Sequence, residues 1–372
     1  MDFAFTETQT AVADLAKKIF EQRLTPAALK AVDADAEHFD RKTWGELAST
    51  GLLGTAIPEA YGGAGQGVLE LLALVQEAGA AVAPMPLWAT LVLGALPITE
   101  FGSDEQRTRL LPRVVAGEAF LTAALAEPDV DDPTRVGTVA QLDGATWTLR
   151  GTKTCVPAAA IAERILVPAA TGPGKLGIFL VAPTAAGVTL ARQITTTGEV
   201  QYRVMLDGVR VGANDVLGDP SRGAAILDWL VARATVALCA MELGVAERAL
   251  RMTASYTTTR EQFERPIATF QAVSQRAADA YVDVEAIRVA TWQAAWRLST
   301  DLPAAEAIST AKYFAATAGH RVVFAAQHLH GGMGFDLDYP LHRYYLWSKQ
   351  IELTLGSASV HLAKLGHALA AE

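Results

Sequence analysis

Two stretches near the carboxyl end decide the fold: TREQFERPIATFQAV at residues 259–273 and HLHGGMGFDLDYPLHRYY at residues 328–345. The first places an arginine and an aromatic residue at a helix end ahead of Pro266, and Gln271 opens the next helix. The second contains a glycine-rich turn, where the backbone can approach a ligand closely. Because arginine makes charge-assisted hydrogen bonds to phosphate oxygens, an arginine together with such a turn suits a pyrophosphate group.

Outward from these stretches, the hydrophobic pattern divides the chain into three parts. Apolar residues recur at helical spacing near both ends, whereas the middle consists of short β-branched runs separated by Gly, Asp-Gly and Pro. Strands and helices do not alternate, which excludes a parallel Rossmann sheet. The sequence therefore predicts an α+β protein with a helical domain at 1–117, an antiparallel β domain at 118–219 and a helical domain at 220–372. Helices are expected at residues 5–20, 44–53, 68–82, 106–115, 225–258, 270–299, 303–328 and 341–369.

The charge balance excludes one class of partner. The chain has 31 Lys plus Arg against 40 Asp plus Glu, a net charge of −9, and no basic tract stands out. A nucleic-acid phosphate backbone would be repelled, so no nucleic-acid partner is expected. Hydrophobic residues make up 51% of the chain and charged residues 19%, which predicts a globular protein rather than a disordered one.

The sequence also predicts a cytoplasmic protein that does not enter a membrane. The amino end has an acidic second residue and no basic segment before an apolar run, so no secretory signal is expected. The longest uncharged stretch, 78–99, contains three prolines, and a packed core helix explains it better than a membrane span. Cys155 and Cys239 lie far apart and fit neither a disulfide framework nor a metal site.

Three short motifs do not decide the function. GGAGQG at 62–67 does not follow a predicted strand and lacks the last glycine of the dinucleotide fingerprint, so a tight turn between helices is expected. GSAS at 356–359 lacks the final glycine of a nucleophile elbow. His328 and His330 have no further ligand at helical spacing, so no metal site is predicted.

At the two opening stretches the chain resembles the acyl-CoA dehydrogenase family, and the resemblance covers its whole length. Four motifs fall in the family's order and spacing: GLLGTAIPEAYGGAG at 51–65, WTLRGTKT at 147–154, REQFERPIATFQ at 260–271 and HGGMGF at 330–335. The resemblance implies a helical domain, a β domain and a C-terminal four-helix bundle, with FAD as cofactor. It also implies oxidation of an acyl-CoA substrate to the 2,3-enoyl-CoA. A glutamate takes the proton next to the thioester carbonyl, and the neighbouring carbon gives a hydride to the flavin. Such a proton is acidic only beside a polarised carbonyl, so the reaction needs a desolvated base.

The resemblance assigns the phosphate and ribityl part of FAD to groups given across a subunit interface. The family has an Arg-x-x-Phe pair, a Gln eleven residues beyond the Arg, and a Gln-x-x-Gly-Gly turn. His328 stands where the family usually has Gln, and a histidine can still donate one N–H. The predicted cofactor-binding residues are Arg260, Phe263, Gln271, His328, Gly331 and Gly332.

The groups that hold the flavin ring in the family are degraded here. The family's Thr-Glu-Pro pattern begins with Ala126, which loses the hydroxyl that would bind the ring. Its Lys-x-Trp-Ile-Thr pattern begins at Lys153 and has Cys155 at the Trp position and Pro157 at the Thr position. Cysteine cannot stack on the ring as an indole does, and proline offers neither a hydroxyl nor an N–H.

Both positions that carry the catalytic base in the family lack a titratable group. An ungapped count places Leu355 on the usual glutamate, and Ala234 occupies the alternative position on the first long C-terminal helix. Glu352, one helical turn before Leu355, is the only nearby substitute. A solvated or paired structural glutamate is the favoured interpretation of Glu352. No catalytic residue is therefore predicted in this chain, with Glu352 as the fallback.

Two hypotheses follow from this pattern. In the first, the chain is a self-sufficient, homo-oligomeric acyl-CoA dehydrogenase, or an oxidase of the same fold, with a relocated base. In the second, which we favour, it is a degenerate subunit that completes the FAD site of a homologous catalytic subunit. Residues 259–288, QAAWR at 293–297 and KQIELTLGSAS at 349–359 resemble the base-less subunits of bacterial steroid acyl-CoA dehydrogenases. That resemblance implies an alpha2beta2 heterotetramer, a steroid side-chain CoA thioester as substrate, and an electron-transfer flavoprotein or similar acceptor.

Overall fold

The computed structural model describes residues 4–370, which form two compact units with interleaved segments. The helical unit contains residues up to 32, residues 68–83 and residues from 235 onward. The sheet unit contains residues 33–67 and 84–234. These units cut the chain differently from the three predicted domains, whose boundaries at 117 and 219 remain predictions.

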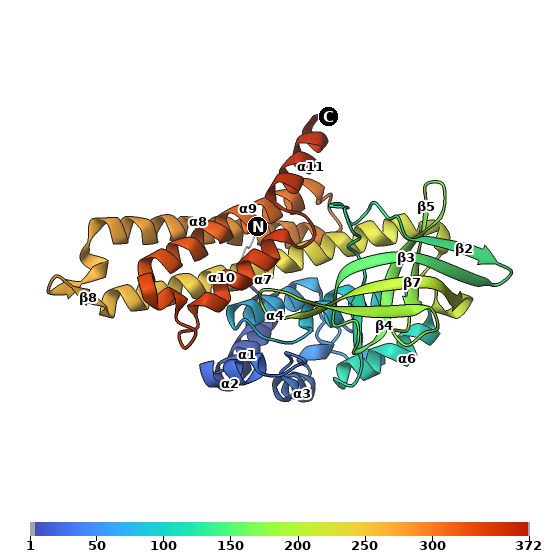
Figure 1. The fold of residues 1–372 in the computed structure, drawn as a ribbon, viewed down its shortest axis with the longest axis horizontal. Coiled ribbons are helices and arrows are strands. Elements are labelled where there is room, and N and C mark those ends of the chain that lie inside the picture. Colours follow the sequence, from blue (N-terminus) through green and yellow to red (C-terminus); the bar gives the residue numbers. More distant parts are fainter. Residues whose placement is uncertain (1–3, 371–372) are drawn as a thin grey trace. The chain divides into compact units, whose positions relative to one another are not determined.

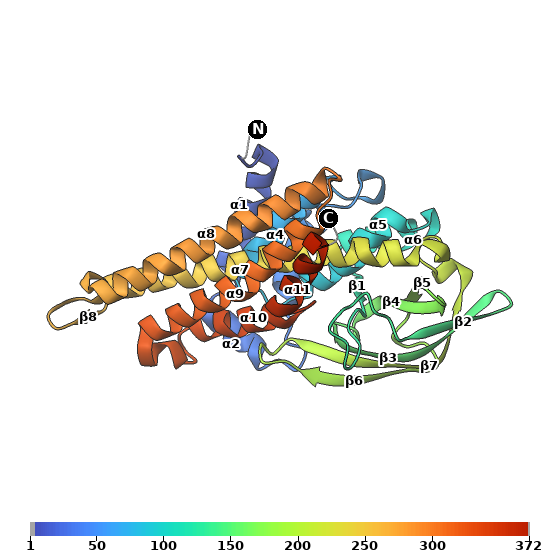
Figure 2. The ribbon, with the colours of Figure 1, turned by 90° about the horizontal axis from the view of Figure 1, so that it is seen from above.

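Long helices build the helical unit, and α7, α8 and α9 run side by side in it (Figures 1 and 2). Buried apolar residues of these three helices, among them Leu243, Ile287 and Val322, form one core cluster. Residues Pro220–Thr259 are apolar and long enough to cross a membrane, but 61% of their most apolar window is buried, as in a core helix. The helices are α1 (Glu7–Arg23), α2 (Pro26–Asp33), α4 (Val68–Ala80), α7 (Gly223–Thr259, which begins in the sheet unit), α8 (Gln271–Ser299), α9 (Ala305–His330), α10 (Leu341–Leu353) and α11 (Ala358–Ala370).

Two glycines let α4 and α7 approach each other closely. A Cβ atom added to Gly79 would lie 2.1 Å from the carbonyl oxygen of Met241, and one added to Gly244 would lie 2.0 Å from that of Gln76. Real Cβ atoms do not come so near a backbone oxygen. Each helix therefore supplies a glycine where the backbone of the other passes.

The helix predicted at 341–369 is wrong in one respect, because it is two helices. The chain leaves α10 at Leu353, and Leu355 and Gly356 follow with φ of +58° and +100°, in the left-handed region. The buried ammonium of Lys312 donates to the carbonyl oxygens of Ile351 and Glu352, at 2.6 and 3.0 Å. This cation stabilises the end of α10, where carbonyl groups lack helical partners.

The sheet unit is built around a sheet with the strand order β1-β4-β2-β3-β7-β6, and β5 pairs with β4. Hairpins join β2 to β3, β4 to β5 and β6 to β7 in antiparallel pairs, as predicted. However, β1 and β2 both pair with β4 in parallel, which their long connections to β4 permit. The predicted fold class is confirmed, with a mixed sheet. The strands are β1 (Phe120–Ala123), β2 (Val139–Asp143), β3 (Thr146–Pro157), β4 (Ala162–Gly172), β5 (Lys175–Val181), β6 (Val188–Ile194) and β7 (Val200–Gly212).

Helices also pack against this sheet. The uncharged stretch does contain a core helix: η3 (Trp88–Ala95), which has π-helical hydrogen bonds and continues into α5 (Leu96–Phe101). Gly94 of η3 touches β1, since a Cβ there would lie 2.2 Å from that of Leu121. The other short elements of the sheet unit are α3 (Arg41–Ser49), η1 (Leu52–Gly54), η2 (Glu59–Tyr61), α6 (Asp104–Val115), η4 (Ala213–Asp215) and η5 (Pro220–Arg222).

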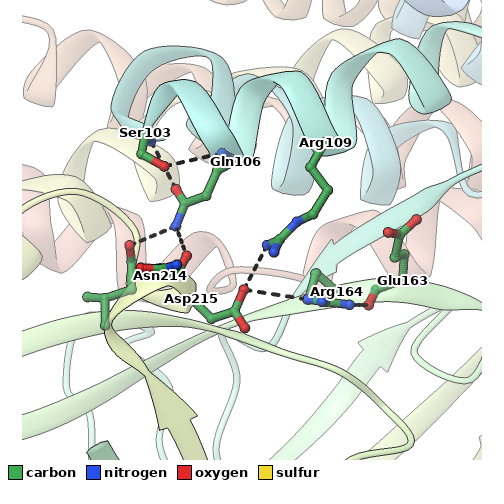
Figure 3. Close-up of polar contacts among 8 residues, drawn as sticks. Ser103, Gln106, Arg109, Glu163, Arg164, Asn214 and Asp215 are labelled. Carbon is green, nitrogen blue, oxygen red and sulfur yellow. Dashed lines mark hydrogen bonds and ion pairs between the residues drawn. The ribbon is translucent and has the colours of Figure 1, made fainter. Parts of the chain in front are cut away.

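Polar side chains tie α6 to the segment after β7 (Figure 3). The amide nitrogen of the Gln106 side chain donates to the carbonyl oxygens of Asn214 and Val216, at 2.8 and 2.9 Å. Arg109, one turn further along α6, donates to the carboxylate of Asp215 at 2.7 Å. The buried amide thus pairs backbone groups that would otherwise be unsatisfied.

Candidate cofactor site

The hairpin that joins α7 to α8 presents an aromatic side chain on a strained turn. Strands β8 (Glu261–Gln262) and β9 (Arg265–Pro266) pair through a two-residue turn made of Phe263 and Glu264. Both turn residues have positive φ, +55° and +63°, a conformation that normally selects glycine or asparagine. Phe263 is 87% exposed. Its ring meets that of Phe270 edge-on, with ring centroids 6.1 Å apart, and is otherwise open to solvent.

Arg260 and Gln271 flank this hairpin, and both are exposed. The amide of Arg260 donates to the Tyr256 carbonyl at the end of α7, and Gln271 is the first residue of α8. Within residues 4–370, the guanidinium of Arg260 has no hydrogen-bond or ion-pair partner. Its five donors are therefore available to an anion.

The glycine turn follows the end of α9 and forms η7 (Gly331–Phe335). Gly331 has φ of +57° and ψ of −133°, and a Cβ added to Gly331 or Gly332 would meet no atom within 4 Å. The backbone there is uncovered. His328 is exposed, whereas the neighbouring Gln327 is buried and donates to the Gly334 carbonyl at 2.7 Å.

The six predicted cofactor-binding residues share one end of the helical unit. Helices α8 and α9 are antiparallel, with Arg321 of α9 bound to Asp283 of α8 at 2.9 Å, so the start of α8 faces the end of α9. Tyr256, one turn before Arg260 on α7, stacks on His330 with ring centroids 4.3 Å apart. The donors gathered here are a guanidinium, an imidazole, an amide and uncovered glycine backbone. That set fits the phosphate part of FAD.

In the sheet unit, a buried ion pair joins the two motifs that were compared above with the family's flavin-ring groups. Lys153 is fully buried and lies 2.6 Å from a carboxylate oxygen of Glu127. Glu127 also accepts hydrogen bonds from the hydroxyl and amide of Thr138 and from the amide of Gly137. Burial alone would raise the pKa of Glu127, but the Lys153 ammonium and Thr138 hold it below its ordinary value. The carboxylate is satisfied within the chain, which makes this pair part of the scaffold.

The residues at the ring positions do not fit a flavin ring. Cys155 has φ of +51° in an irregular stretch of β3, and its amide donates to the side-chain oxygen of Gln193 at 2.9 Å. Thr154 donates its hydroxyl to the same oxygen at 3.2 Å. Pro157 has no N–H. These groups offer no aromatic surface, and the Cys155 amide is already paired.

The two base positions hold apolar side chains in ordered surroundings. Leu355 is half-buried in its left-handed conformation, and its carbonyl oxygen lies 3.0 Å from Nε2 of His361. Ala234 is fully buried, and its carbonyl accepts a hydrogen bond from the indole of Trp88 at 3.2 Å. Neither side chain can take a proton.

The fallback residue, Glu352, has its charge matched by neighbours. Its carboxylate lies 2.5 Å from the Lys349 ammonium and 4.0 Å from Nδ1 of His320. Its side chain is 22% exposed. This geometry agrees with a paired structural glutamate. Among residues 4–370, no group of three His, Cys, Asp or Glu is placed to hold a metal ion.

Sequence reasoning missed one buried acid, Glu242 on α7. Its side chain is fully buried, and one carboxyl oxygen accepts from the Ser348 hydroxyl at 2.7 Å. Burial raises the pKa of Glu242 to about 8, so the carboxyl is largely protonated at neutral pH. Gly319 leaves room for it, since a Cβ there would lie 2.2 Å from a Glu242 oxygen. The available signal was a lone acid in the apolar run TVALCAMELGVA.

The chain is similar in sequence to known proteins along its whole length. The sequence model described as the N-terminal domain of acyl-CoA dehydrogenase matches residues 6–118, and the one described as the C-terminal domain matches residues 221–370. The chain is 39% identical to acyl-CoA dehydrogenase FadE27 of Mycobacterium tuberculosis, over 100% of this chain and 99% of that protein.

Two solved structures are similar along nearly the whole chain. One is the ChsE4-ChsE5 complex of Mycobacterium tuberculosis, with a TM-score of 0.94 and 39% identity over 100% of this chain and 99% of that one. The other is a variant of the Tcur3481-Tcur3483 steroid ACAD, with a TM-score of 0.92 and 46% identity over 98% of each chain.

Proposed function

Because the chain belongs to the acyl-CoA dehydrogenase family, we propose that it is the non-catalytic subunit of a two-chain acyl-CoA dehydrogenase. The cofactor is FAD, as predicted, and when bound it accepts a hydride from the substrate carbon next to the one that loses the proton. In the proposed complex, this chain holds part of the FAD of a homologous catalytic subunit.

One contrast carries this proposal. The groups that would grip the phosphate part of FAD are present and exposed, whereas those that would hold the ring and remove the proton are absent. Phe263 and Arg260 reach outward at one end of the helical unit. Cys155, Pro157 and Leu355 replace the ring and base groups. Random decay of a whole enzyme would not spare only the groups that act across an interface.

The division of labour follows from what these residues can do. Arg260 can bind a phosphate, and the uncovered backbone at Gly331 and Gly332 can approach it. Proton removal needs a carboxylate within hydrogen-bond reach of the substrate, which Leu355 and Ala234 cannot supply. Buried Ala234 already has the Trp88 indole against its carbonyl. The base in this proposal belongs to the partner.

An apolar row on α8 supports association with another chain. Val282, Val289 and Trp296 recur at seven-residue spacing, and their exposed fractions are 65%, 68% and 38%. Such a row on one helix face is typical of helix pairing between subunits. We propose a homologous catalytic subunit as the partner in an alpha2beta2 assembly. The similarity to ChsE4-ChsE5, described as a complex, supports a two-chain enzyme.

For the substrate, we propose a steroid side-chain CoA thioester. The support is the 46% identity to a chain of a protein described as a steroid ACAD. An electron-transfer flavoprotein or a similar acceptor would reoxidise the flavin, and the proposed location is the cytoplasm.

The test is to purify the chain alone and measure flavin absorbance per chain and acyl-CoA-dependent dye reduction. We expect a colourless, inactive protein, because the ring positions offer no stacking surface and no base is present. The same measurements on the chain co-expressed with a catalytic partner should give FAD and activity. Near-stoichiometric FAD with dye reduction by the isolated chain would instead support the self-sufficient dehydrogenase or oxidase.

A further inference from the structure

His330 connects the glycine turn to two other segments of the helical unit. The imidazole is 3% exposed and lies directly before Gly331. Its Nδ1 is 2.8 Å from the Ala326 carbonyl oxygen, and its Nε2 is 3.1 Å from the Tyr339 hydroxyl. Its ring stacks on Tyr256 of α7, with 21° between the planes. One side chain thus touches the helix before the turn, the loop after it and the helix that leads to Arg260.

These contacts fix the protonation of the ring. A carbonyl oxygen only accepts hydrogen bonds, so Nδ1 must carry the proton that is donated to Ala326. In the neutral ring Nε2 is then an acceptor, and the Tyr339 hydroxyl donates to it. Burial lowers the pKa of His330, which favours this neutral form. The imidazole therefore uses both nitrogens within the chain, and neither is left for a ligand.

We propose that His330 is a positioning residue: held by Ala326, Tyr339 and Tyr256, it fixes the Gly331–Phe335 turn in the conformation that leaves Gly331 and Gly332 uncovered for the phosphates of the partner's FAD. This inference rests on the proposed role of the turn. Gln327, which donates to Gly334, holds the middle of the same turn. The two histidines of the sequence HxHGG therefore differ in role. His328 is exposed and is available to a ligand, whereas His330 is buried and holds the turn.

The first experiment measures the turn itself in the isolated chain. Tyr339→Phe removes only the hydroxyl that donates to His330 and keeps the ring in place. Because one hydrogen bond contributes about 1 kcal/mol, amide hydrogen exchange of residues 331–335 should become about fivefold faster. Tyr61→Phe, which removes a hydroxyl from the sheet unit, is the matched control and should leave this exchange unchanged. Unchanged exchange in Tyr339→Phe would overturn the positioning role.

The second experiment measures FAD release from the assembled complex by flavin fluorescence, for Tyr339→Phe, His330→Ala and Arg260→Ala. We expect Tyr339→Phe to release FAD about fivefold faster, with unchanged assembly, and His330→Ala to release it faster still. If His330→Ala fails to fold, Tyr339→Phe decides the question alone. Faster turn exchange with normal FAD release would overturn the inference, provided Arg260→Ala releases FAD. Normal release from Arg260→Ala as well would overturn the proposed function.

Discussion

Among the residues that the structure describes, the Arg260 guanidinium has no partner, and it lies where the proposed assembly needs a free cation. A charge-assisted hydrogen bond contributes on the order of 1.5 to 3 kcal/mol, so Arg260→Ala should weaken FAD retention by the complex about ten- to hundredfold. The measurement is FAD content after dilution of the assembled complex. Arg150→Ala is the control, because Arg150 forms an exposed ion pair with Asp207 that should matter little. Unchanged FAD content in assembled Arg260→Ala would contradict the proposed contact between this arginine and the FAD phosphates.

Glu352 tests whether this chain supplies the base. The variant Glu352→Gln keeps the shape of the side chain and removes its charge, which Lys349 already balances. We expect turnover of the assembled complex to change only a few-fold, the size of effect typical of a disturbed structural pair. A thousandfold loss, with assembly and FAD content intact, would correspond to about 4 kcal/mol of transition-state stabilisation and would make the chain catalytic.

Glu242 gives the helical unit a pH dependence that can be measured. In the folded chain its pKa is about 8, whereas an unfolded glutamate titrates near 4.5. Between these values the folded state holds the proton that the unfolded state loses, so Glu242's contribution to stability is complete below pH 4.5 and declines as the pH rises toward 8. Burial lowers the pKa of Lys312 to about 8, so this lysine changes the pH dependence of stability only above pH 8.

We therefore expect the melting temperature of Glu242→Gln to fall less between pH 5 and pH 7.5 than that of the unmodified chain. Each unit of pKa difference corresponds to about 1.4 kcal/mol, so the effect should amount to several degrees. Glu306→Gln, at an exposed position on α9, is the control and should follow the unmodified chain. Parallel curves for Glu242→Gln and the unmodified chain would contradict the assigned protonation.

At the scale of elements, the crossing of α4 and α7 depends on two glycines. Gly244→Ala would place a methyl group 2.0 Å from a backbone oxygen, so the helices must separate. We expect a loss of unfolding free energy on the order of 3 kcal/mol, measured by denaturant titration. Gly366→Ala on exposed α11 meets no atom within 4 Å and should instead stabilise the chain by up to about 1 kcal/mol. Equal effects of the two substitutions would show that the crossing can open without cost.

Hydrophobic spacing predicted most of the elements, and its failures have physical causes. Amphipathic helices such as α6 and α9 were found because one face is polar. Helix α2 is only eight residues long, and its signal is little more than Pro26 at the first helical position. In η3 the sequence WATLVLGA is apolar on every side, so no period marks its unusual turns. The break before α11 depends on Leu355 in a left-handed conformation, which leucine rarely adopts.

The candidate site was only partly within reach of the sequence. Motif spacing selected Arg260 and Phe263, and the structure places them at one exposed end with the glycine turn. The sequence could not show that Phe263 lies on a strained turn, because neither Phe263 nor Glu264 is a residue that such turns normally select. The role of His330 depends on Tyr339 and Tyr256, whose contacts come from three-dimensional packing.

At the scale of the whole molecule, the proposal treats this chain as half of an active unit. The chain folds into two interleaved units, yet in the proposal the chemistry of the family is divided between two subunits. The groups proposed to bind the phosphates lie on the helical unit, and the sheet unit has the Lys153–Glu127 pair without the groups that would contact a ring. In the proposed assembly, this chain can lack the base without loss of activity, because the partner supplies a base.

The turn that presents Phe263 also bears on how much of each chain a cell should make. A chain without its partner would retain the strain at Phe263 and Glu264 and would leave both the Phe263 ring and the apolar row on α8 in water. Those surfaces favour aggregation and proteolysis. Excess copies of this chain would be short-lived. A cell would then have to make the two subunits in balanced amounts to accumulate either the protein or its activity.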